Sequence, residues 1–171
     1  MTDRSGVVLI GMPGAGKSTV GVVLAKRMGL AFVDTDLVIQ SAQGGLLQDI
    51  LDREGPAGFR RLEERTLLSL DAENAVIATG GSVVYGSDGM AALSRLGTIV
   101  FLDVPLAELT RRIRDMDRRG MVIAPGESFA DLYAHRLPLY RRYAELTIDC
   151  TGRTVEEIAT EIAARLAEPG D

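Results

Sequence analysis

The stretch Gly11-Met-Pro-Gly-Ala-Gly-Lys-Ser18 decides the fold, because it matches the phosphate-binding pattern G-x-x-x-x-G-K-[ST]. The apolar run Val7-Val-Leu-Ile10 leads into it as a buried strand would. A helical pattern leaves it, with Val20, Leu24 and Met28 on one face. A glycine-rich turn that merely links a strand to a helix is the alternative. The strand–loop–helix order favours a nucleoside triphosphate site.

The residue types in this loop suit phosphate binding. Glycines let backbone N–H groups approach phosphate oxygens, and the helix that begins there adds N–H groups and the positive end of its dipole. Lys17 can reach the β- and γ-phosphates, and the hydroxyl of Ser18 can bind Mg²⁺. The residues expected to bind ATP in this loop are Gly11, Gly14, Ala15, Gly16, Lys17, Ser18 and Thr19.

The composition indicates one domain and narrows the possible partners. The length of 171 residues fits a single domain over 1–171. A net charge of −5 argues against a nucleic-acid surface. No apolar run reaches the roughly 20 residues that span a bilayer, and the chain enters its first strand without a signal peptide. Cys150 is the only cysteine, so no internal disulfide can form and we expect a reducing cytoplasm. We also expect a monomer. His135 has no metal-ligand spacing around it, so no metal is expected there.

Alternating strands and helices predict an α/β fold, a three-layer sandwich in which helices cover both faces of a five-stranded parallel sheet. The expected strands are 7–10, 30–34, 75–79, 98–104 and 146–149. Beyond the loop helix, the expected helices are 37–42, 46–53, 58–70, 90–96, 106–116, 129–143 and a last one capped by Thr154 and Glu157. Pro138 is expected to bend the helix that contains it.

A phosphate-binding loop alone does not separate an NTPase motor, a GTPase switch and a small-molecule kinase. No NKxD-like guanine motif and no coupling domain are visible, which favours the kinase. Asp34-Thr-Asp36 follows the second strand, at the sheet edge where ligands of parallel sheets bind. One carboxylate can hold Mg²⁺ through water, and the other can orient and deprotonate an attacking hydroxyl. An Asp-x-Asp here is also a common helix cap.

Three arginines are candidates for binding an anionic substrate. Arg60 lies in Phe59-Arg-Arg-Leu-Glu-Glu64, Arg119 in a charged loop, and Arg136 in Arg136-Leu-Pro-Leu-Tyr140. Each alone is more typical of a solvated helix face than of a binding site. Glu63 follows Arg60 by three residues and could hold its guanidinium.

In this order, the motifs resemble those of the shikimate kinases over essentially the whole chain. The shared features are the phosphate-binding loop, Asp34-Thr-Asp36, the Phe59–Glu64 motif, Gly80-Gly81 after the third strand and the Arg136–Tyr140 helix. The resemblance implies a P-loop fold of the nucleoside monophosphate kinase type. It also implies ATP- and Mg²⁺-dependent phosphorylation of a shikimate hydroxyl, giving shikimate 3-phosphate.

The resemblance also implies roles for individual residues. Asp36 contacts the substrate hydroxyls and acts as the base, and Asp34 and Ser18 serve the metal. Arg60 and Arg136 hold the substrate carboxylate beside Gly80 and Gly81. The helical region at about 35–62 binds substrate, and a lid at about 117–127 brings in Arg119, which together with Lys17 and Asp36 completes the expected catalytic set. Arg112 packs on adenine, and Arg119 and Arg153 also belong to the ATP site.

Two positions depart from the family pattern, both at the acceptor site. Ser82 stands where the family usually has a third glycine, unless this chain is one glycine short. The lid reads Arg119-Gly-Met-Val122 where Arg-Pro-Leu-Leu is usual. A same-fold kinase for another hydroxy acid, such as homoserine or a sugar acid, is therefore an alternative. A regulatory module without turnover would have lost Lys17, Asp34 or Asp36, and all three are present.

Overall fold

The computed structural model describes residues 5–114, 121 and 123–168, and it confirms the predicted α/β fold. Every strand pairing is parallel, and the order across the sheet is β2-β3-β1-β4-β5. The strands are β1 (Gly6–Ile10), β2 (Ala31–Asp34), β3 (Ala75–Ala78), β4 (Gly97–Asp103) and β5 (Leu146–Asp149). Each lies within about a residue of its predicted range.

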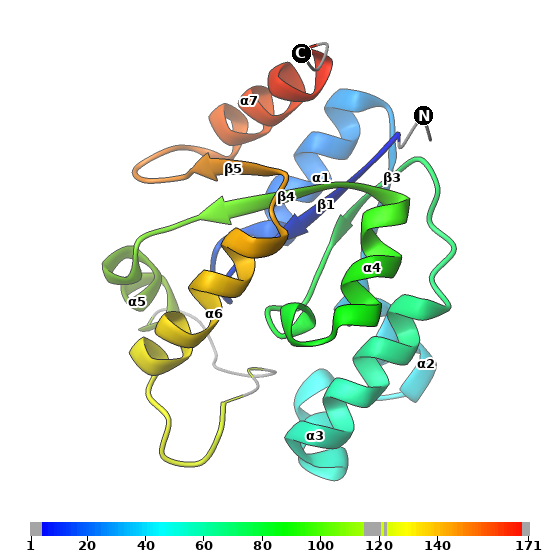
Figure 1. Cartoon of the computed structure of the whole chain (residues 1–171), viewed down its shortest axis with the longest axis vertical. Helices are drawn as coiled ribbons and strands as arrows, with labels where there is room; N and C mark the ends of the chain where they lie inside the picture. The colour runs from blue at the N-terminus through cyan, green and yellow to red at the C-terminus, as the bar shows by residue number, and fades with distance from the viewer. Residues whose placement is uncertain (1–4, 115–120, 122, 169–171) are drawn as a thin grey trace.

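Helices cover both faces of this sheet (Figure 1). Helices α1 and α7 pack against each other on one face, and α4 and α6 lie on the other. The helical elements are α1 (Lys17–Met28), α2 (Thr35–Gln43), α3 (Leu47–Leu68), the 3₁₀ turn η1 (Val83–Tyr85), α4 (Ser87–Leu96), α5 (Leu106–Arg114), α6 (Phe129–Tyr143) and α7 (Val155–Ala167). A capping box of Thr154 and Glu157 starts α7, as predicted. Helix α6 continues through Pro138 without a break.

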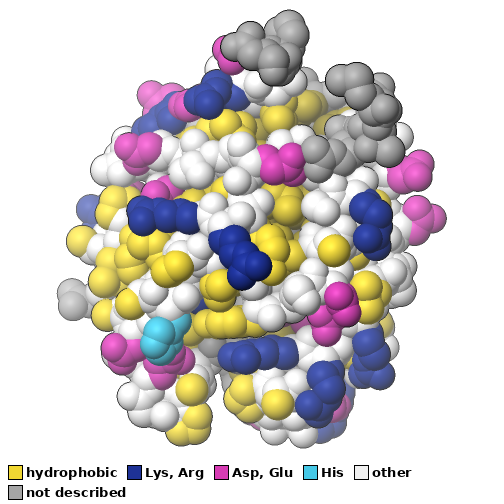
Figure 2. Space-filling model, viewed as in Figure 1, with side chains coloured by type: hydrophobic (Ala, Val, Ile, Leu, Met, Phe, Trp, Pro, Cys, Tyr) yellow, Lys and Arg dark blue, Asp and Glu magenta, His cyan; other side chains and the backbone are white. Residues whose placement is uncertain are grey.

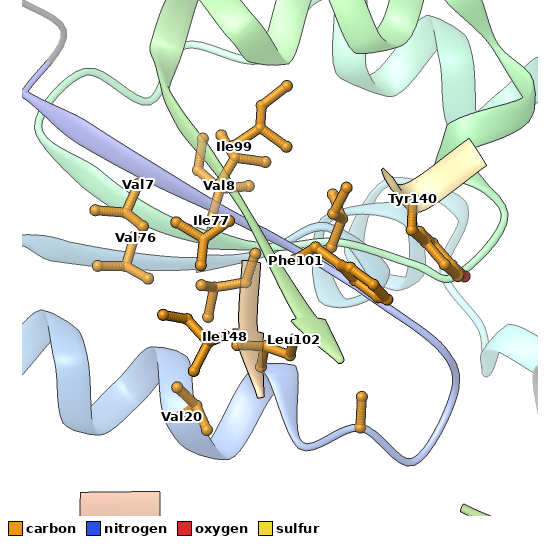
Figure 3. Packing of buried hydrophobic residues seen from close by; sticks show 14 of the residues in the cluster. Val7, Val8, Val20, Val76, Ile77, Ile99, Phe101, Leu102, Tyr140 and Ile148 are labelled. Atoms are coloured by element: carbon orange, nitrogen blue, oxygen red, sulfur yellow. The ribbon is translucent and has the colours of Figure 1, made fainter. Parts of the chain in front are cut away.

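The main core lies between these layers. Val8 of β1 pairs with Ile77 of β3 and Ile99 of β4, and all three side chains are at most 3% exposed. Figure 3 shows them stacked across neighbouring strands, with the rings of Phe101 and Tyr140 side by side. The two ring centroids are 5.2 Å apart, and the ring planes are nearly parallel. Continuous apolar strands are buried because helices cover both sides of the sheet.

Helices α2 and α3 form a smaller unit with a hydrophobic cluster of its own. Its buried members are Ile39, Ile50, Leu51, Phe59 and Leu62. A kink divides α3, where Gly55 has a φ of +70° before Pro56, so the predicted break between two helices is present inside one continuous element. This unit stands beside the carboxyl end of β2 and carries the residues expected to bind substrate.

The isolated residues of the sequence have ordinary partners. Cys150 is fully buried at the end of β5, as expected of an apolar filler. His135 contacts Glu127, its Nδ1 lying 2.7 Å from Oε1, on a surface where acidic and basic side chains are interspersed (Figure 2). No helix within the described residues is long and apolar enough to cross a membrane.

Candidate active site

The phosphate-binding loop joins β1 to α1 through a backbone that needs glycine. Gly14 and Gly16 have φ values of 81° and 91°, in the left-handed region that other residues avoid. The Nζ of Lys17 donates to the carbonyls of Gly11 at 2.7 Å and Met12 at 2.9 Å. The lysine is thus folded back over its own loop, and these contacts leave it poised to exchange loop carbonyls for phosphate oxygens.

Asp34 links this loop to α2. Its Oδ2 accepts a hydrogen bond from the Ser18 hydroxyl at 2.7 Å, and its Oδ1 accepts from the backbone N–H groups of Asp36 and Leu37. The helix-cap alternative is therefore correct for Asp34. Because the cap fixes the carboxylate beside Ser18, two oxygen ligands suited to a divalent cation lie together. The cap also explains why α2 begins at Thr35, two residues before the predicted start.

A cavity of about 340 Å³ opens beside the loop at the carboxyl ends of the strands. It is lined by residues from the loop, α2, α3, the turn after β3 and α6, including Lys17, Ser18, Asp36, Glu63, Gly80 and Arg136. Such crevices beyond the strand ends are where open parallel sheets bind ligands. The structure brings the predicted base, the predicted glycines and one predicted arginine to a single pocket.

The charges in this pocket alter one another's protonation. Burial raises the pKa of Asp36 to about 6, and the nearby carboxylate of Asp34 raises it too, while Lys17 opposes the shift. Burial lowers the pKa of Lys17 to about 8, although Asp36 works in the other direction. A carboxylate with a pKa near the working pH is well suited to accept a proton.

The contacts of Glu63 differ from the predicted pairing with Arg60. Its Oε1 accepts a 2.6 Å hydrogen bond from the Ser82 hydroxyl, and no ion pair joins it to Arg60 among the residues described. Its Oε2 has no hydrogen-bond partner within that same set. Burial raises the pKa of Glu63 to about 7, whereas the hydrogen bond from Ser82 lowers it. The serine that departs from the family pattern is thus the hydroxyl partner of a buried carboxyl group.

The two glycines of the turn after β3 lie against the charged ends of side chains in the cavity. A Cβ at Gly80 would lie 2.6 Å from Glu63 Oε2 and 3.0 Å from Asp36 Oδ1. A Cβ at Gly81 would lie 2.6 Å from a guanidinium nitrogen of Arg136. Any larger residue would push apart the charged groups that line the cavity.

Arg136 is held deep in the site. It is 1% exposed on α6, one helical turn before Tyr140, whose hydroxyl donates to the carbonyl of Gly81 at 2.7 Å. Arg60 lies instead on the exposed side of α3 and borders a smaller neighbouring cavity of about 150 Å³. The two arginines meet at Tyr85, whose ring both guanidiniums contact.

The arginines expected at the ATP site are dispersed. Arg112 donates to the carbonyl of Gly14 at 3.1 Å and pairs with Glu108, so it lies directly against the loop. Arg153 is bonded to Asp149 and Glu161 near the start of α7. Arg119 lies outside the described residues, as do the other residues of 117–120 and residue 122 of the lid expected at about 117–127. Met121, which is described, lines the main cavity.

Sequence reasoning did not assign Tyr85, Tyr140 and Ser82 to roles at this site. The Ser82 departure was visible, but its partner Glu63 is 19 residues away in the chain. Tyr85 carried no motif that pointed to the arginines. A signal was present only for Tyr140, which lies within the Arg136–Tyr140 motif.

Comparisons with known proteins agree with the motifs. The sequence profile described as Shikimate kinase matches residues 13–167. The shikimate kinase of Paracidovorax citrulli is 41% identical over 168 residues, covering 95% of this chain and 92% of the relative. That of Aromatoleum aromaticum is 43% identical over 84% of this chain and 83% of the relative.

Solved structures give the same result. Shikimate kinase from Acinetobacter baumannii, determined in complex with shikimate, superimposes with a TM-score of 0.84 at 32% identity, covering 96% of this chain and 94% of that one. The enzyme from Aquifex aeolicus gives a TM-score of 0.80 at 31% identity, covering 94% and 95%. Members of this family are ATP-dependent kinases that generally need a divalent metal. With its phosphate-binding loop, its buried acidic and basic groups and these similarities over almost its full length, the chain belongs to the shikimate kinase family.

Proposed function

We propose that this protein transfers the γ-phosphoryl group of ATP to a hydroxyl of shikimate. The observation that carries the proposal is that Lys17, Asp36 and Arg136 line the same cavity at the carboxyl edge of the sheet. A relative solved with shikimate bound supports the choice of acceptor. A phosphate-binding lysine, a carboxylate base and a carboxylate-binding arginine are the groups that such a transfer requires.

The residues divide the reaction between them. The loop Gly11–Ser18 and Thr19 hold the phosphates, and Lys17 neutralises charge on the β- and γ-oxygens. Asp36 receives the proton of the attacking hydroxyl, helped by a raised pKa of about 6. Arg136 and Arg60 hold the carboxylate by charge-assisted hydrogen bonds, next to Gly80 and Gly81. Arg112 and Arg153 assist nucleotide binding, and Arg119 arrives with the lid.

The proposed metal for this reaction is Mg²⁺. Ser18 and Asp34 would hold it, because their oxygens already lie 2.7 Å apart beside the loop. Mg²⁺ prefers oxygen ligands and binds through few protein groups, with waters and substrate phosphates completing its shell. When bound, the ion would neutralise negative charge on the phosphates of ATP while the γ-phosphoryl group is transferred.

A coupled ADP-release assay tests the function. Shikimate, homoserine, gluconate and no acceptor are compared at saturating ATP and Mg²⁺. Shikimate is expected to give a rate at least about a hundredfold above the acceptor-free rate, since typical kinase turnover is about 1–100 s⁻¹. A preference for homoserine or gluconate would move the proposal to another hydroxy acid, and equal rates with and without acceptor would refute a kinase.

A further inference from the structure

One aromatic ring lies against both arginines that are proposed to hold the acceptor carboxylate. The Cζ atom of Arg60 is 4.4 Å from the ring centroid of Tyr85, and that of Arg136 is 5.4 Å from it. Both distances are within the roughly 6 Å over which an aromatic face attracts a guanidinium. Arg60 belongs to α3 and Arg136 to α6, so Tyr85 is the point at which the two helices' cations meet.

The carboxyl group of Glu63 lies near enough to both guanidiniums for each to lower its pKa, and the ring of Tyr85 is a second neighbour that they share. Like charges brought together repel, and the repulsion is strongest where water is excluded, as around Arg136 with its 1% exposure. The negative face of an aromatic ring offsets part of that repulsion for both cations without competing for their N–H donors from within their plane. The ring contact itself uses none of the N–H donors of either guanidinium.

The ring itself is held by a rigid turn. Val83 and Val84 of η1 are each 2% exposed, and the backbone N–H of Tyr85 donates to the carbonyl of Ser82 at 3.1 Å. The Ser82 side chain is in turn bonded to Glu63 of α3. Because the backbone beneath Tyr85 is fixed on the core side, its half-exposed ring has a defined position above the two arginines.

We propose that Tyr85 is a positioning residue, whose ring holds Arg60 and Arg136 in place for the acceptor carboxylate before the acceptor binds. This inference rests on the proposed function, since it takes the acceptor to carry a carboxylate. A free arginine loses rotamer freedom when a ligand fixes it, and a ring that already fixes it reduces that loss. Tyr85 therefore acts on acceptor binding and leaves the phosphoryl-transfer groups unaffected.

Two substitutions at this position separate ring from hydroxyl. Tyr85→Leu removes the aromatic face, and Tyr85→Phe keeps it. With shikimate as acceptor, Tyr85→Leu is expected to raise the acceptor KM by about 3- to 30-fold, the range given by cation–π energies, with kcat and the KM for ATP unchanged within about twofold. Tyr85→Phe is expected to behave as wild type. Equal losses in the two variants, a leucine variant with wild-type KM, or a parallel rise in the KM for ATP would each overturn the proposal.

The chain offers a matched control elsewhere. The ring of Tyr143 also contacts an arginine, because the Cζ of Arg142 lies 5.8 Å from its centroid. Tyr143 lines neither cavity. Tyr143→Leu removes an equivalent pair, so the acceptor KM is expected to stay at its wild-type value. In an Arg60→Ala background, Tyr85→Leu should cost less than in wild type, because one of its two partners is already gone.

A spectroscopic measurement decides the contact independently of turnover. Guanidinium Nε–H protons over an aromatic ring are shifted upfield, so the ¹H–¹⁵N signals of Arg60 and Arg136 should move downfield in Tyr85→Leu and stay in place in Tyr85→Phe. Signals that do not move in either variant would overturn the inference. Wild-type turnover of shikimate in the same assays tests the proposed function separately, so failure of one is not mistaken for failure of the other.

Discussion

The proposed nucleotide side and the proposed acceptor side of the pocket are built in different ways. The proposed nucleotide side is one continuous loop, Gly11–Ser18, which offers backbone N–H groups and one lysine. The acceptor side collects Asp36 from α2, Glu63 from α3, Ser82 before η1 and Arg136 from α6. A site made from neighbours in the chain tolerates changes elsewhere, whereas a site made from four elements depends on how each of them packs.

The two sides also differ in their electrostatics. The loop offers fixed dipoles and Lys17, whose pKa burial lowers to about 8, whereas the acceptor side contains two buried carboxyl groups with raised pKa values, Asp36 at about 6 and Glu63 at about 7. Substitutions on the nucleotide side should therefore reduce turnover with any acceptor. Substitutions on the acceptor side should change which acceptor binds, and at which pH.

The largest effect is expected for Lys17→Ala. It removes the cation that neutralises the β- and γ-phosphates, so kcat should fall by at least about a hundredfold while the fold persists. Circular dichroism and steady-state kinetics measure the two properties. Lys26→Ala is the control, because Lys26 is the chain's other lysine and is exposed in the last turn of α1. A loss of less than about tenfold would mean that this loop is not the catalytic one.

Asp36→Asn is expected to be next in size. It keeps the shape of the side chain but removes the proton acceptor, so kcat should fall by roughly a hundredfold or more. In wild type, kcat/KM should decline as the pH falls through about 6, where Asp36 becomes protonated. The pH profile of kcat/KM for the Asp36→Asn variant should lack that decline. If kcat survives and only the acceptor KM rises, Asp36 positions the substrate and is not the base.

Arg136→Ala tests the acceptor side directly. The KM for shikimate should rise about 10- to 100-fold because a buried charge-assisted pair is lost, while the KM for ATP changes little. An acceptor whose carboxylate is reduced to an alcohol should show a similar loss with wild type and little further loss with the variant. If the losses caused by the substitution and by the reduced acceptor simply add, the acceptor carboxylate does not contact Arg136. Arg141→Ala, in the same helix but exposed, serves as the control.

A smaller effect is expected for Ser82. Ser82→Ala removes the hydrogen bond to Glu63, and Ser82→Gly also restores the glycine usual in the family. Loss of one hydrogen bond to a charged group should change the acceptor KM by about 2- to 10-fold. Because that bond lowers the pKa of Glu63, its loss should raise this pKa further and move the pH dependence of the acceptor KM upward. Kinetics from pH 6 to 8 measure both, and pH profiles identical to wild type would show that Ser82 does not set the state of Glu63.

The last prediction concerns the stability of the fold and not its activity. Glu63 has a pKa of about 7 in the folded chain against an ordinary 4.5, so the folded state binds this proton more tightly. The free energy of unfolding should therefore fall as the pH rises from about 4.5 to 7, by about 1–3 kcal/mol for this one group. Glu63→Gln cannot titrate and should lack that component. Urea unfolding at pH 5 and pH 8 checks the difference, and equal pH dependence in both proteins would contradict the raised pKa.

Prediction from sequence succeeded where the signal was local. The strand Leu146–Asp149 and the helix Phe129–Tyr143 were predicted at their observed bounds, because hydrophobic periodicity and capping residues act within a few positions. The start of α2 was predicted two residues late, because Asp34 was assigned to the metal and the helix-cap alternative was not used to set the helix start; its bonds to the N–H groups of Asp36 and Leu37 begin the helix at Thr35. Cap and metal ligand are compatible roles for one carboxylate with two oxygens.

The sequence by itself determined the phosphate-binding loop, the parallel sheet that carries it and the identities of the charged residues at the strand ends. These follow from backbone preferences of glycine and from apolar periodicity, which neighbouring residues encode. Only the tertiary structure decided that Glu63 pairs with Ser82 and not with Arg60, and that Tyr85 lies between Arg60 and Arg136. Those partners are 19 to 51 positions apart, and which of several possible charged contacts forms depends on how α3, η1 and α6 pack around one cavity.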